Sequence, residues 1–243
     1  MRCFGLLGFP LTHSFSQKYF KKKFEELKLR DCEYENFSIQ NIEEFSEILH
    51  NRKDLRGFNI TIPYKKQILP FLDENSDVVT EIGACNCVNI INGRLIGHNT
   101  DAIAFEQSLH PFLQPHHRNA LVLGTGGASA AIAFVLKKLG IQVQFVSRTP
   151  SETAISYENL NEVILSSYLL IINTTPVGMY PNVEDFPKLP YQFISAQHHF
   201  YDLTYNPIET KFLEKGRLRG ATTQNGQDML VLQAEESWRI WNS

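Results

Sequence analysis

The stretch at 119–140, NALVLGTGGASAAIAFVLKKLG, decides the fold of the second half of the chain. It opens with a short apolar run at 119–123 and continues through a glycine-rich turn at 124–129. A helix-like segment at 130–139 follows, and Gly140 can end it. A strand that passes through a glycine turn into a helix is typical of a dinucleotide-binding unit. A tight turn without a ligand is the alternative.

The glycines of this turn suit a phosphate group. Gly124, Gly126 and Gly127 would let the backbone approach a pyrophosphate, and the N-terminus of the following helix favours negative charge. The usual third glycine is replaced by Ser129, which is small enough for close packing. The turn therefore predicts a dinucleotide site.

Three more apolar runs follow, and each ends in a polar cluster. Strands are expected at 141–146, 168–172 and 199–203, and the clusters are 147–149, 173–176 and 204–207. Repeated β-α-β predicts a parallel, doubly wound sheet. Because ligands bind such sheets at the carboxyl ends of the strands, we expect these clusters to line the cofactor site.

The end of the second strand indicates which dinucleotide binds. An acidic residue there would pair with a ribose 2′-hydroxyl. This chain instead carries Ser147, Arg148 and Thr149. A guanidinium flanked by two hydroxyls suits a 2′-phosphate, so the sequence favours NADP.

The first hundred residues also alternate between strand-like and helix-like segments. We expect strands near 2–7, 32–38 and 57–61, and helices near 15–28, 41–50, 101–109 and 227–241. The fold class is therefore α/β.

Polar residues follow the first and third of these strands. Ser14 and Ser16 can cap the helix they precede, or bind a carboxylate with their hydroxyls. Asn59 and Thr61 alternate onto one face of their strand. Lys65 is expected at a helix start, where the dipole disfavours it, so an acidic partner such as Asp101 is the natural compensation. Taken alone, each of these two charges is most often a surface residue.

A set of motifs resembles the shikimate dehydrogenase family, in the family's order and across nearly the whole chain. They are GFPLTHSFS at 8–16, NITIPYK at 59–65, GACN at 83–86, NTD at 99–101, GTGGA at 124–128, NTTPVGM at 173–179, YDLTYNP at 201–207 and the stretch 224–233. Any one motif is weak, but the ordered set is specific. Ser147 departs from the family, which usually has asparagine there.

The resemblance implies two α/β domains with a cleft between them: a substrate domain from 1–100 plus 226–243, and a Rossmann-like, doubly wound NADP domain from 101–225. It also implies reduction of 3-dehydroshikimate to shikimate by NADPH, in aromatic amino acid biosynthesis. Lys65 and Asp101 would be the catalytic pair. The other substrate residues would be Ser14, Ser16, Asn59, Thr61, Asn86, Tyr205 and Gln233. The cofactor residues would be Gly124, Gly126, Gly127, Ala128, Ser147, Arg148, Thr149, Thr174, Leu203 and Gly226.

Other functions remain open at this point. The chain could be an NAD-dependent quinate/shikimate dehydrogenase. It could be a non-catalytic metabolite sensor, although such a protein is expected to have lost Lys65 or Asp101. A generic Rossmann protein related to methylenetetrahydrofolate dehydrogenase would not account for the substrate residues as a set.

Composition and charge further narrow the class of protein to which the chain can belong. The formal net charge of −3 over 243 residues gives no basic excess for nucleic acid or an anionic membrane. Without a leader-like or spanning segment, a cytoplasmic protein is expected, as a monomer or homodimer. The four cysteines show no disulfide or zinc pattern, so no metal is expected. Whether Cys85 and Cys87 are redox-sensitive is left open.

Overall fold

The structure, a computed structural model, describes residues 1–11 and 15–243. Its contacts divide the chain into two compact units, one of 1–100 with 233–243 and one of 101–232. The first division falls after Thr100. The second division falls before Gln233, inside the C-terminal helix.

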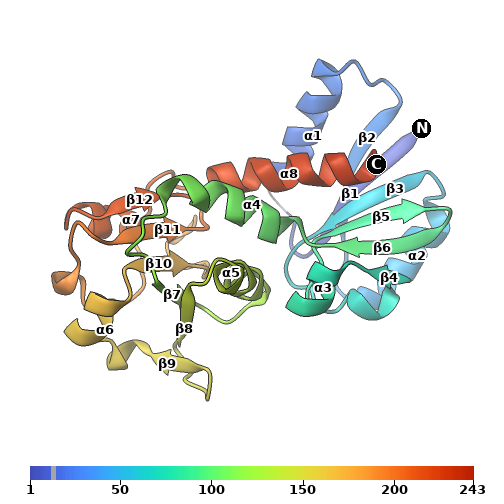
Figure 1. Cartoon of the computed structure of the whole chain (residues 1–243). Helices are drawn as coiled ribbons and strands as arrows, with labels where there is room; N and C mark the ends of the chain where they lie inside the picture. Colours follow the sequence, from blue (N-terminus) through green and yellow to red (C-terminus); the bar gives the residue numbers. More distant parts are fainter. Residues whose placement is uncertain (12–14) are drawn as a thin grey trace. The chain divides into compact units, whose positions relative to one another are not determined.

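The first unit contains a six-stranded mixed sheet in the order β2-β1-β3-β5-β6-β4 (Figure 1). Its strands are β1 (Arg2–Gly8), β2 (Cys32–Ser38), β3 (Leu55–Ile60), β4 (Glu74–Asn75), β5 (Cys87–Ile91) and β6 (Arg94–His98). Strands β1, β2 and β3 are parallel, whereas β5 runs antiparallel to both β3 and β6. The hairpin between β5 and β6 turns through Asn92 and Gly93, which have φ values of 53° and 80°.

Helices cover both faces of this sheet. They are α1 (Phe15–Glu26), α2 (Phe45–Asn51), α3 (Asp77–Ile82) and the end of α8 (Gln227–Trp241), with short 3-10 turns at Ile42–Glu44 and Leu69–Phe71. Side-chain alternation along β1 builds two cores. Phe4 and Leu6 pack with residues of α1 and α8, whereas Cys3 and Leu7 pack with residues around α2.

The second unit contains a six-stranded parallel sheet in the order β12-β11-β10-β7-β8-β9. The strands are β7 (Asn119–Leu123), β8 (Gln142–Ser147), β9 (Ala154–Ser156), β10 (Leu170–Asn173), β11 (His199–Asp202) and β12 (Thr222–Gln224). Read from β9, this is the strand order 3-2-1-4-5-6 of the Rossmann fold, with its switch point between β7 and β10. The doubly wound prediction is confirmed.

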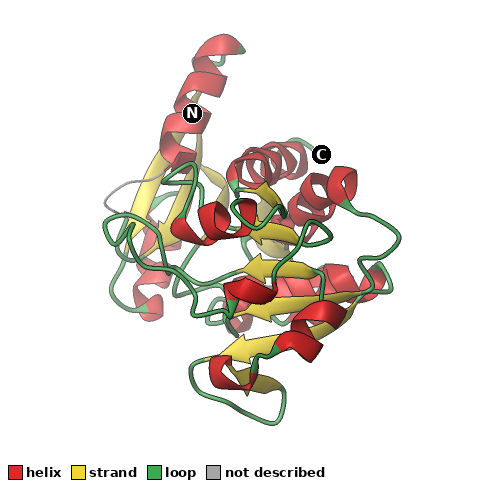
Figure 2. Ribbon diagram, turned by 90° about the vertical axis from the view of Figure 1, so that its left-hand side faces the viewer, coloured by secondary structure: helices red, strands yellow, loops and turns green. Residues whose placement is uncertain are grey.

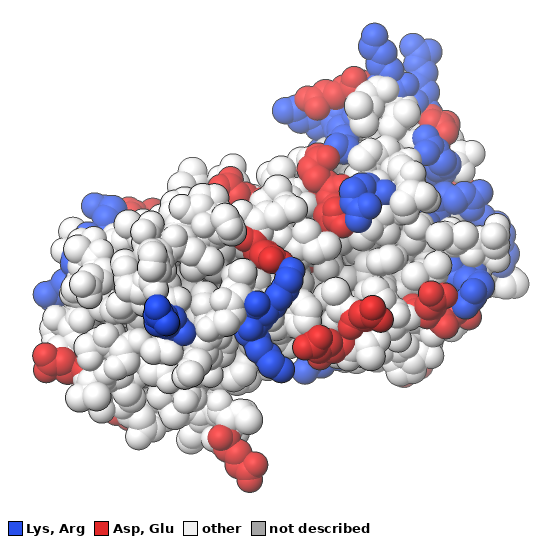
Figure 3. Space-filling view, in the orientation of Figure 1, with Lys and Arg blue, Asp and Glu red and all other residues white. Residues whose placement is uncertain are grey.

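The helices of this unit are α4 (Thr100–Leu109), α5 (Gly127–Lys138), α6 (Glu162–Ser167) and α7 (Lys211–Arg217), with 3-10 turns at His110–Phe112, Tyr157–Asn159 and Tyr191–Phe193. Figure 2 shows helices flanking the strands. Within the described residues, no helix is long and apolar enough to cross a membrane. On the face seen in Figure 3, basic and acidic side chains are interspersed.

One local prediction is wrong. Lys65 was expected at the start of a helix, but the described residues 62–68 form a run of turns that leads into the 3-10 turn Leu69–Phe71. The dipole argument for an acidic partner of Lys65 therefore does not apply. Hydrogen bonds within the turns hold the backbone of this segment, from Tyr64 N to Thr61 O (3.0 Å) and from Ile68 N to Tyr64 O (3.0 Å).

Candidate active site

The backbone around Thr61 and Lys65 is fixed by its neighbours in the first unit. The Thr61 amide donates to Leu7 O (2.9 Å), which ties the end of β3 to β1. The carbonyl of Lys65 accepts from the amide of Cys85 (2.8 Å), just before β5. The buried Tyr64 donates from its hydroxyl to Ile39 O (2.7 Å). Both candidate residues are half-buried at the end of the sheet where β1 and β3 finish.

A buried chain of hydrogen bonds crosses this end of the unit. Tyr34 donates to Asn59 Oδ1 (2.9 Å), and Asn59 Nδ2 donates to Ser237 Oγ (2.8 Å). Ser237 donates in turn to Gln233 O (2.8 Å) on α8. Burial raises the pKa of Tyr34 well above its usual range, and a hydrogen bond with the side chain of Ser16 opposes that shift. Four segments distant in sequence are thereby joined.

Asn86 holds the beginning of α4. Its Oδ1 accepts from the Thr100 amide (2.6 Å), and its Nδ2 donates to Thr100 Oγ1 (3.0 Å). Thr100 Oγ1 also lies 3.4 Å from Ser237 Oγ. Asp101, which is buried, follows Thr100 directly in the first turn of α4. The Asn86 pair therefore fixes the backbone from which the Asp101 side chain projects.

The structure joins part of the predicted substrate set. Asn59, Asn86 and Gln233 belong to one hydrogen-bonded cluster in the first unit, which also reaches Ser16 through Tyr34. Asp101 and Tyr205 belong to the second unit. Ser14 lies outside the described residues.

Sequence reasoning missed Tyr34, Thr100 and Ser237 as the residues that hold this cluster together. Thr100 lies within the quoted NTD motif. Ser237 had a signal, because it lies four residues after Gln233 and therefore on the same face of a helix. Tyr34 had none, since its partner Asn59 is distant in sequence.

The glycine turn of the second unit has the geometry that its sequence predicts. Gly124 has φ of 110°, and a Cβ at that position would lie 2.8 Å from Thr174 Oγ1. Gly126 is the N-cap of α5, and a Cβ there would meet nothing within 4 Å. Ser129 Oγ lies 2.7 Å from Thr174 Oγ1, which donates to Leu123 O (2.7 Å). The turn is thus tied to β10 across the switch point, while its tip stays open.

The other cofactor candidates also lie at the carboxyl ends of the parallel strands. Ser147 ends β8, and its Oγ accepts from the Thr149 amide (3.2 Å), while Arg148 is exposed. Gly226 follows β12, and a Cβ there would overlap the backbone of Leu203. An exposed guanidinium, an open helix N-terminus and a glycine pressed against a neighbouring strand end fit an extended dinucleotide.

A buried aspartate, Asp202, connects the carboxyl ends of two of these strands by hydrogen bonds. Asp202 accepts from Thr210 Oγ1 (2.6 Å), the Thr204 amide (3.0 Å) and Asn173 Nδ2 (3.1 Å). Burial raises the pKa of Asp202 to about 6, and these hydrogen bonds lower it in part. Asp202 therefore positions the ends of β10 and β11.

Comparison with known proteins places the chain among enzymes. A family model described as the shikimate dehydrogenase substrate binding domain matches residues 6–88. The chain is 36% identical over 258 residues to the NADP(+) shikimate dehydrogenase of Caldicellulosiruptor saccharolyticus, and the match covers 99% of this chain and 92% of that protein.

Two solved structures are similar to this chain over nearly its whole length. The shikimate dehydrogenase of Thermus thermophilus in complex with NADP(H) and shikimate has a TM-score of 0.87 and 33% identity, with 99% of this chain and 93% of that chain covered. The ligand-free 5-ketofructose reductase of a Gluconobacter species has a TM-score of 0.84 and 28% identity, with 99% and 92% covered.

Proposed function

Because the chain belongs to the shikimate dehydrogenase family, we propose that it catalyses the NADPH-dependent reduction of 3-dehydroshikimate to shikimate, a reaction of aromatic amino acid biosynthesis. The main support for this proposal is the near full-length similarity to the Thermus thermophilus enzyme, whose structure was solved with NADP(H) and shikimate. The cofactor edge of this chain supports the proposal, because its glycine turn, switch point and exposed arginine are all in place.

NADP fits the second unit through the chain's own residues. The N-terminus of α5 and the amides of Gly126, Gly127 and Ala128 would bind the pyrophosphate. Arg148, with Ser147 and Thr149, would bind the 2′-phosphate. Thr174, Leu203 and Gly226 would line the path toward the nicotinamide.

In the proposed chemistry Lys65 is the proton donor. Bound NADPH supplies the hydride that adds to the ketone carbon. As the carbonyl π bond breaks, its electron pair moves to the oxygen, which then takes a proton from the Lys65 ammonium group. The neutral amine of Lys65 regains its proton from solvent. Asp101 is assigned the role of holding Lys65 and a ring hydroxyl.

The hydrogen bonds already present limit what the two asparagines can offer a ligand. Asn59 uses both amide hydrogens, on Ser237 Oγ and on Asn86 O (3.4 Å), so it can only accept, through the second lone pair of Oδ1. Asn86 keeps one amide hydrogen beyond that given to Thr100. We assign Asn59 as an acceptor and Asn86 as a donor to ring hydroxyls.

The roles of the remaining substrate residues are assigned from the hydrogen-bonding groups of their side chains. Thr61 and Gln233 would hydrogen-bond the ring. Ser14, Ser16 and Tyr205 would bind the carboxylate with their hydroxyls. The Ser16 hydroxyl would then exchange its bond to Tyr34 for one to the ligand.

The test is initial-rate kinetics of the purified protein in the oxidative direction, with shikimate and quinate each combined with NADP and NAD. Turnover that prefers shikimate and NADP is expected. Preference for quinate or NAD would keep the reaction type and overturn the assigned specificity. A folded protein that binds shikimate without turnover would instead be a metabolite sensor.

A control substrate separates this activity from that of another relative. The chain shares 28% identity with a 5-ketofructose reductase. In the reductive direction with NADPH, 3-dehydroshikimate should therefore be compared with 5-ketofructose. Faster reduction of 5-ketofructose would contradict the proposed substrate.

A further inference from the structure

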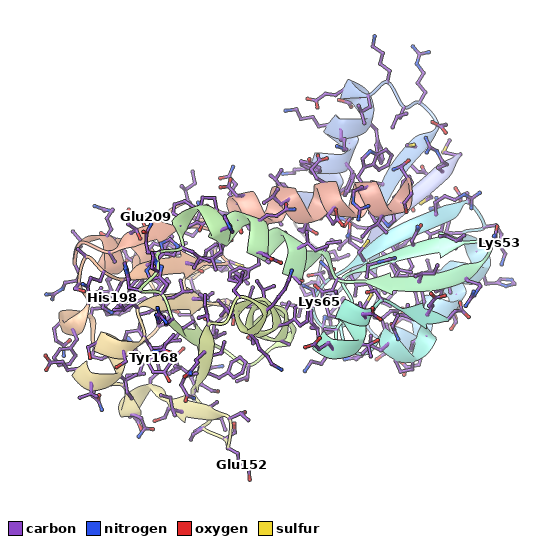
Figure 4. The ribbon with its side chains drawn as sticks, viewed as in Figure 1. Lys53, Lys65, Glu152, Tyr168, His198 and Glu209 are labelled. Atoms are coloured by element: carbon purple, nitrogen blue, oxygen red, sulfur yellow. The ribbon has the colours of Figure 1, made fainter. Side chains whose placement is uncertain are left out.

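The buried hydrogen bonds of the first unit form a chain with one direction, which begins on α8. The carbonyl of Gln233 can only accept, so the hydroxyl hydrogen of Ser237 is used on it (2.8 Å). Ser237 Oγ then offers lone pairs, and Asn59 donates to them from Nδ2 (2.8 Å), which orients the Asn59 amide. Asn59 lies near the end of β3 that leads to Lys65, and Figure 4 shows Lys65 and Lys53 at opposite ends of the sheet.

Tyr34 carries the same chain from Asn59 to Ser16 on α1. Because Asn59 Oδ1 has no hydrogen, the Tyr34 hydroxyl must donate to it (2.9 Å). Burial holds the pKa of Tyr34 well above its usual range, so the hydroxyl keeps this hydrogen at neutral pH. The Tyr34 oxygen can then only accept, which makes Ser16 the donor in the hydrogen bond between their side chains. The chain therefore directs the hydroxyl hydrogen of Ser16 toward Tyr34.

Packing holds the Tyr34 ring independently of its hydroxyl. The ring stacks on that of Phe20, with centroids 4.7 Å apart and 12° between the planes. Phe20 lies four residues after Ser16, so both side chains project from the same face of α1. Ser16, Tyr34 and Asn59 are all buried. A phenylalanine at position 34 would keep this stacking and remove only the hydroxyl group.

We propose that Tyr34 is a positioning residue that holds the Ser16 hydroxyl hydrogen until the substrate carboxylate takes it, and thereby weakens substrate binding. This inference rests on the proposed function, which assigns Ser16 to the carboxylate. A carboxylate only accepts and Ser16 has one hydroxyl hydrogen, so the ligand and Tyr34 compete for it. The bond between Ser16 and Tyr34 must break when the ligand binds, and its loss opposes binding. The bond between Tyr34 and Asn59 is present before and after binding, so it cancels from the binding free energy.

The test is calorimetric titration of shikimate into protein saturated with NADPH. Shikimate and NADPH are both reduced compounds, so no turnover accompanies binding. Tyr34→Phe should lower the Kd for shikimate roughly threefold or more, because one buried hydrogen bond no longer has to break. Its free energy of unfolding, measured by urea denaturation, should nevertheless fall, because Asn59 Oδ1 loses a donor. Lower stability together with an unchanged or higher Kd is the result of a purely structural role and would overturn the proposal.

A double-mutant cycle shows whether Tyr34 acts through Ser16. Ser16→Ala should raise the Kd for shikimate, and adding Tyr34→Phe to that variant should change the Kd less than about twofold. An equal gain in affinity with and without Ser16 would overturn the proposal. Tyr201→Phe is the matched control, because Tyr201 is buried in the second unit and its hydroxyl lies 2.8 Å from Ser108 Oγ. It should lower stability and leave the Kd unchanged, and a gain in affinity like that of Tyr34→Phe would also contradict the proposal.

A second measurement does not require a variant of Tyr34 to fold. In wild-type protein labelled with ¹³C at the tyrosine Cζ atoms, the Tyr34 signal should shift when shikimate binds, because Oη loses the Ser16 hydrogen. In Ser16→Ala that hydrogen is already missing, so the same signal should not shift. Shikimate that binds to wild type without moving the Tyr34 signal would overturn this inference alone. Wild type that does not bind shikimate at all would contradict the proposed function itself, and this inference with it.

Discussion

Lys65 is the side chain on which the proposed chemistry depends most directly. Lys65→Ala should lower kcat by roughly 100-fold or more while KM for shikimate changes little, because in shikimate oxidation Lys65 would accept the hydroxyl proton in the transition state, the reverse of its role in the reduction. Steady-state kinetics at saturating NADP measures this. Lys66→Ala, at the exposed neighbouring lysine, should keep normal kcat. An unchanged kcat in Lys65→Ala would remove Lys65 from the mechanism.

Arg148 is the residue that should distinguish the two dinucleotides. Arg148→Gln should raise KM for NADP roughly tenfold or more and leave KM for NAD nearly unchanged, because in the proposed binding mode the guanidinium contacts only the 2′-phosphate. The exposed Arg219 provides the matched change, and Arg219→Gln should affect neither constant. A parallel rise in both KM values would place the phosphate contact elsewhere.

Single residues also show where sequence reasoning succeeded and where it stopped. The conformation of Gly124 could be predicted from sequence, because the local turn requires its positive φ of 110°. Tyr34 could not, since its role arises from Asn59, 25 residues away. Lys65 was placed on the wrong element, because turn hydrogen bonds hold 62–68 without a helix.

At the scale of elements, α8 carries both Gln233 and the buried Ser237. Ser237→Ala would leave Asn59 Nδ2 with only its 3.4 Å bond to Asn86 O, and should cost about 1–3 kcal/mol of unfolding free energy. Because Asn59 would lose its orientation, KM for shikimate should rise as well. Urea denaturation and steady-state kinetics measure the two effects.

A serine of the second unit is the control for this variant. Ser108 is also buried, donates to a carbonyl of its own helix and lies 2.8 Å from Tyr201 Oη. Ser108→Ala should lower stability by a similar amount without raising KM for shikimate. If both variants changed KM equally, the effect of Ser237 would come from stability alone.

The β5–β6 hairpin is the element that sequence reasoning could have found and did not. Asn92-Gly93 between two apolar runs is a strong hairpin signal, and both residues have positive φ as a type I′ turn requires. This hairpin makes the first sheet mixed. Of the parallel strands of the second unit, β7, β8, β10 and β11 were predicted, because each is an apolar run followed by a glycine-rich or polar cluster. The short strands β9 and β12 carry no such signal and were not predicted.

At the scale of the whole molecule, the second unit contains opposing buried titratable groups. Burial lowers the pKa of His117 and His198, and lowers that of His199 to about 4. Stability from these neutral histidines is present above their unfolded pKa of about 6.5 and is lost as the pH falls below it. Asp202 acts oppositely, because its raised pKa contributes stability that is present at low pH and lost as the pH rises through about 6.

Asp202 should therefore partly offset acid destabilisation by the histidines. The Asp202→Asn variant lacks this offset, so its stability should fall more steeply than wild type between about pH 6.5 and pH 4, by about 3 kcal/mol in total for a two-unit pKa shift. Both tryptophans, Trp238 and Trp241, lie in the first unit, so their fluorescence does not report on the second. Urea unfolding followed by hydrogen exchange of β10 and β11 measures the relevant free energy at each pH. Asp185→Asn, at an exposed aspartate of the same unit, should run parallel to wild type. If Asp202→Asn also ran parallel, the Asp202 carboxylate would be ionised at the same pH in the folded and unfolded chains, and its burial would carry no pH-dependent cost.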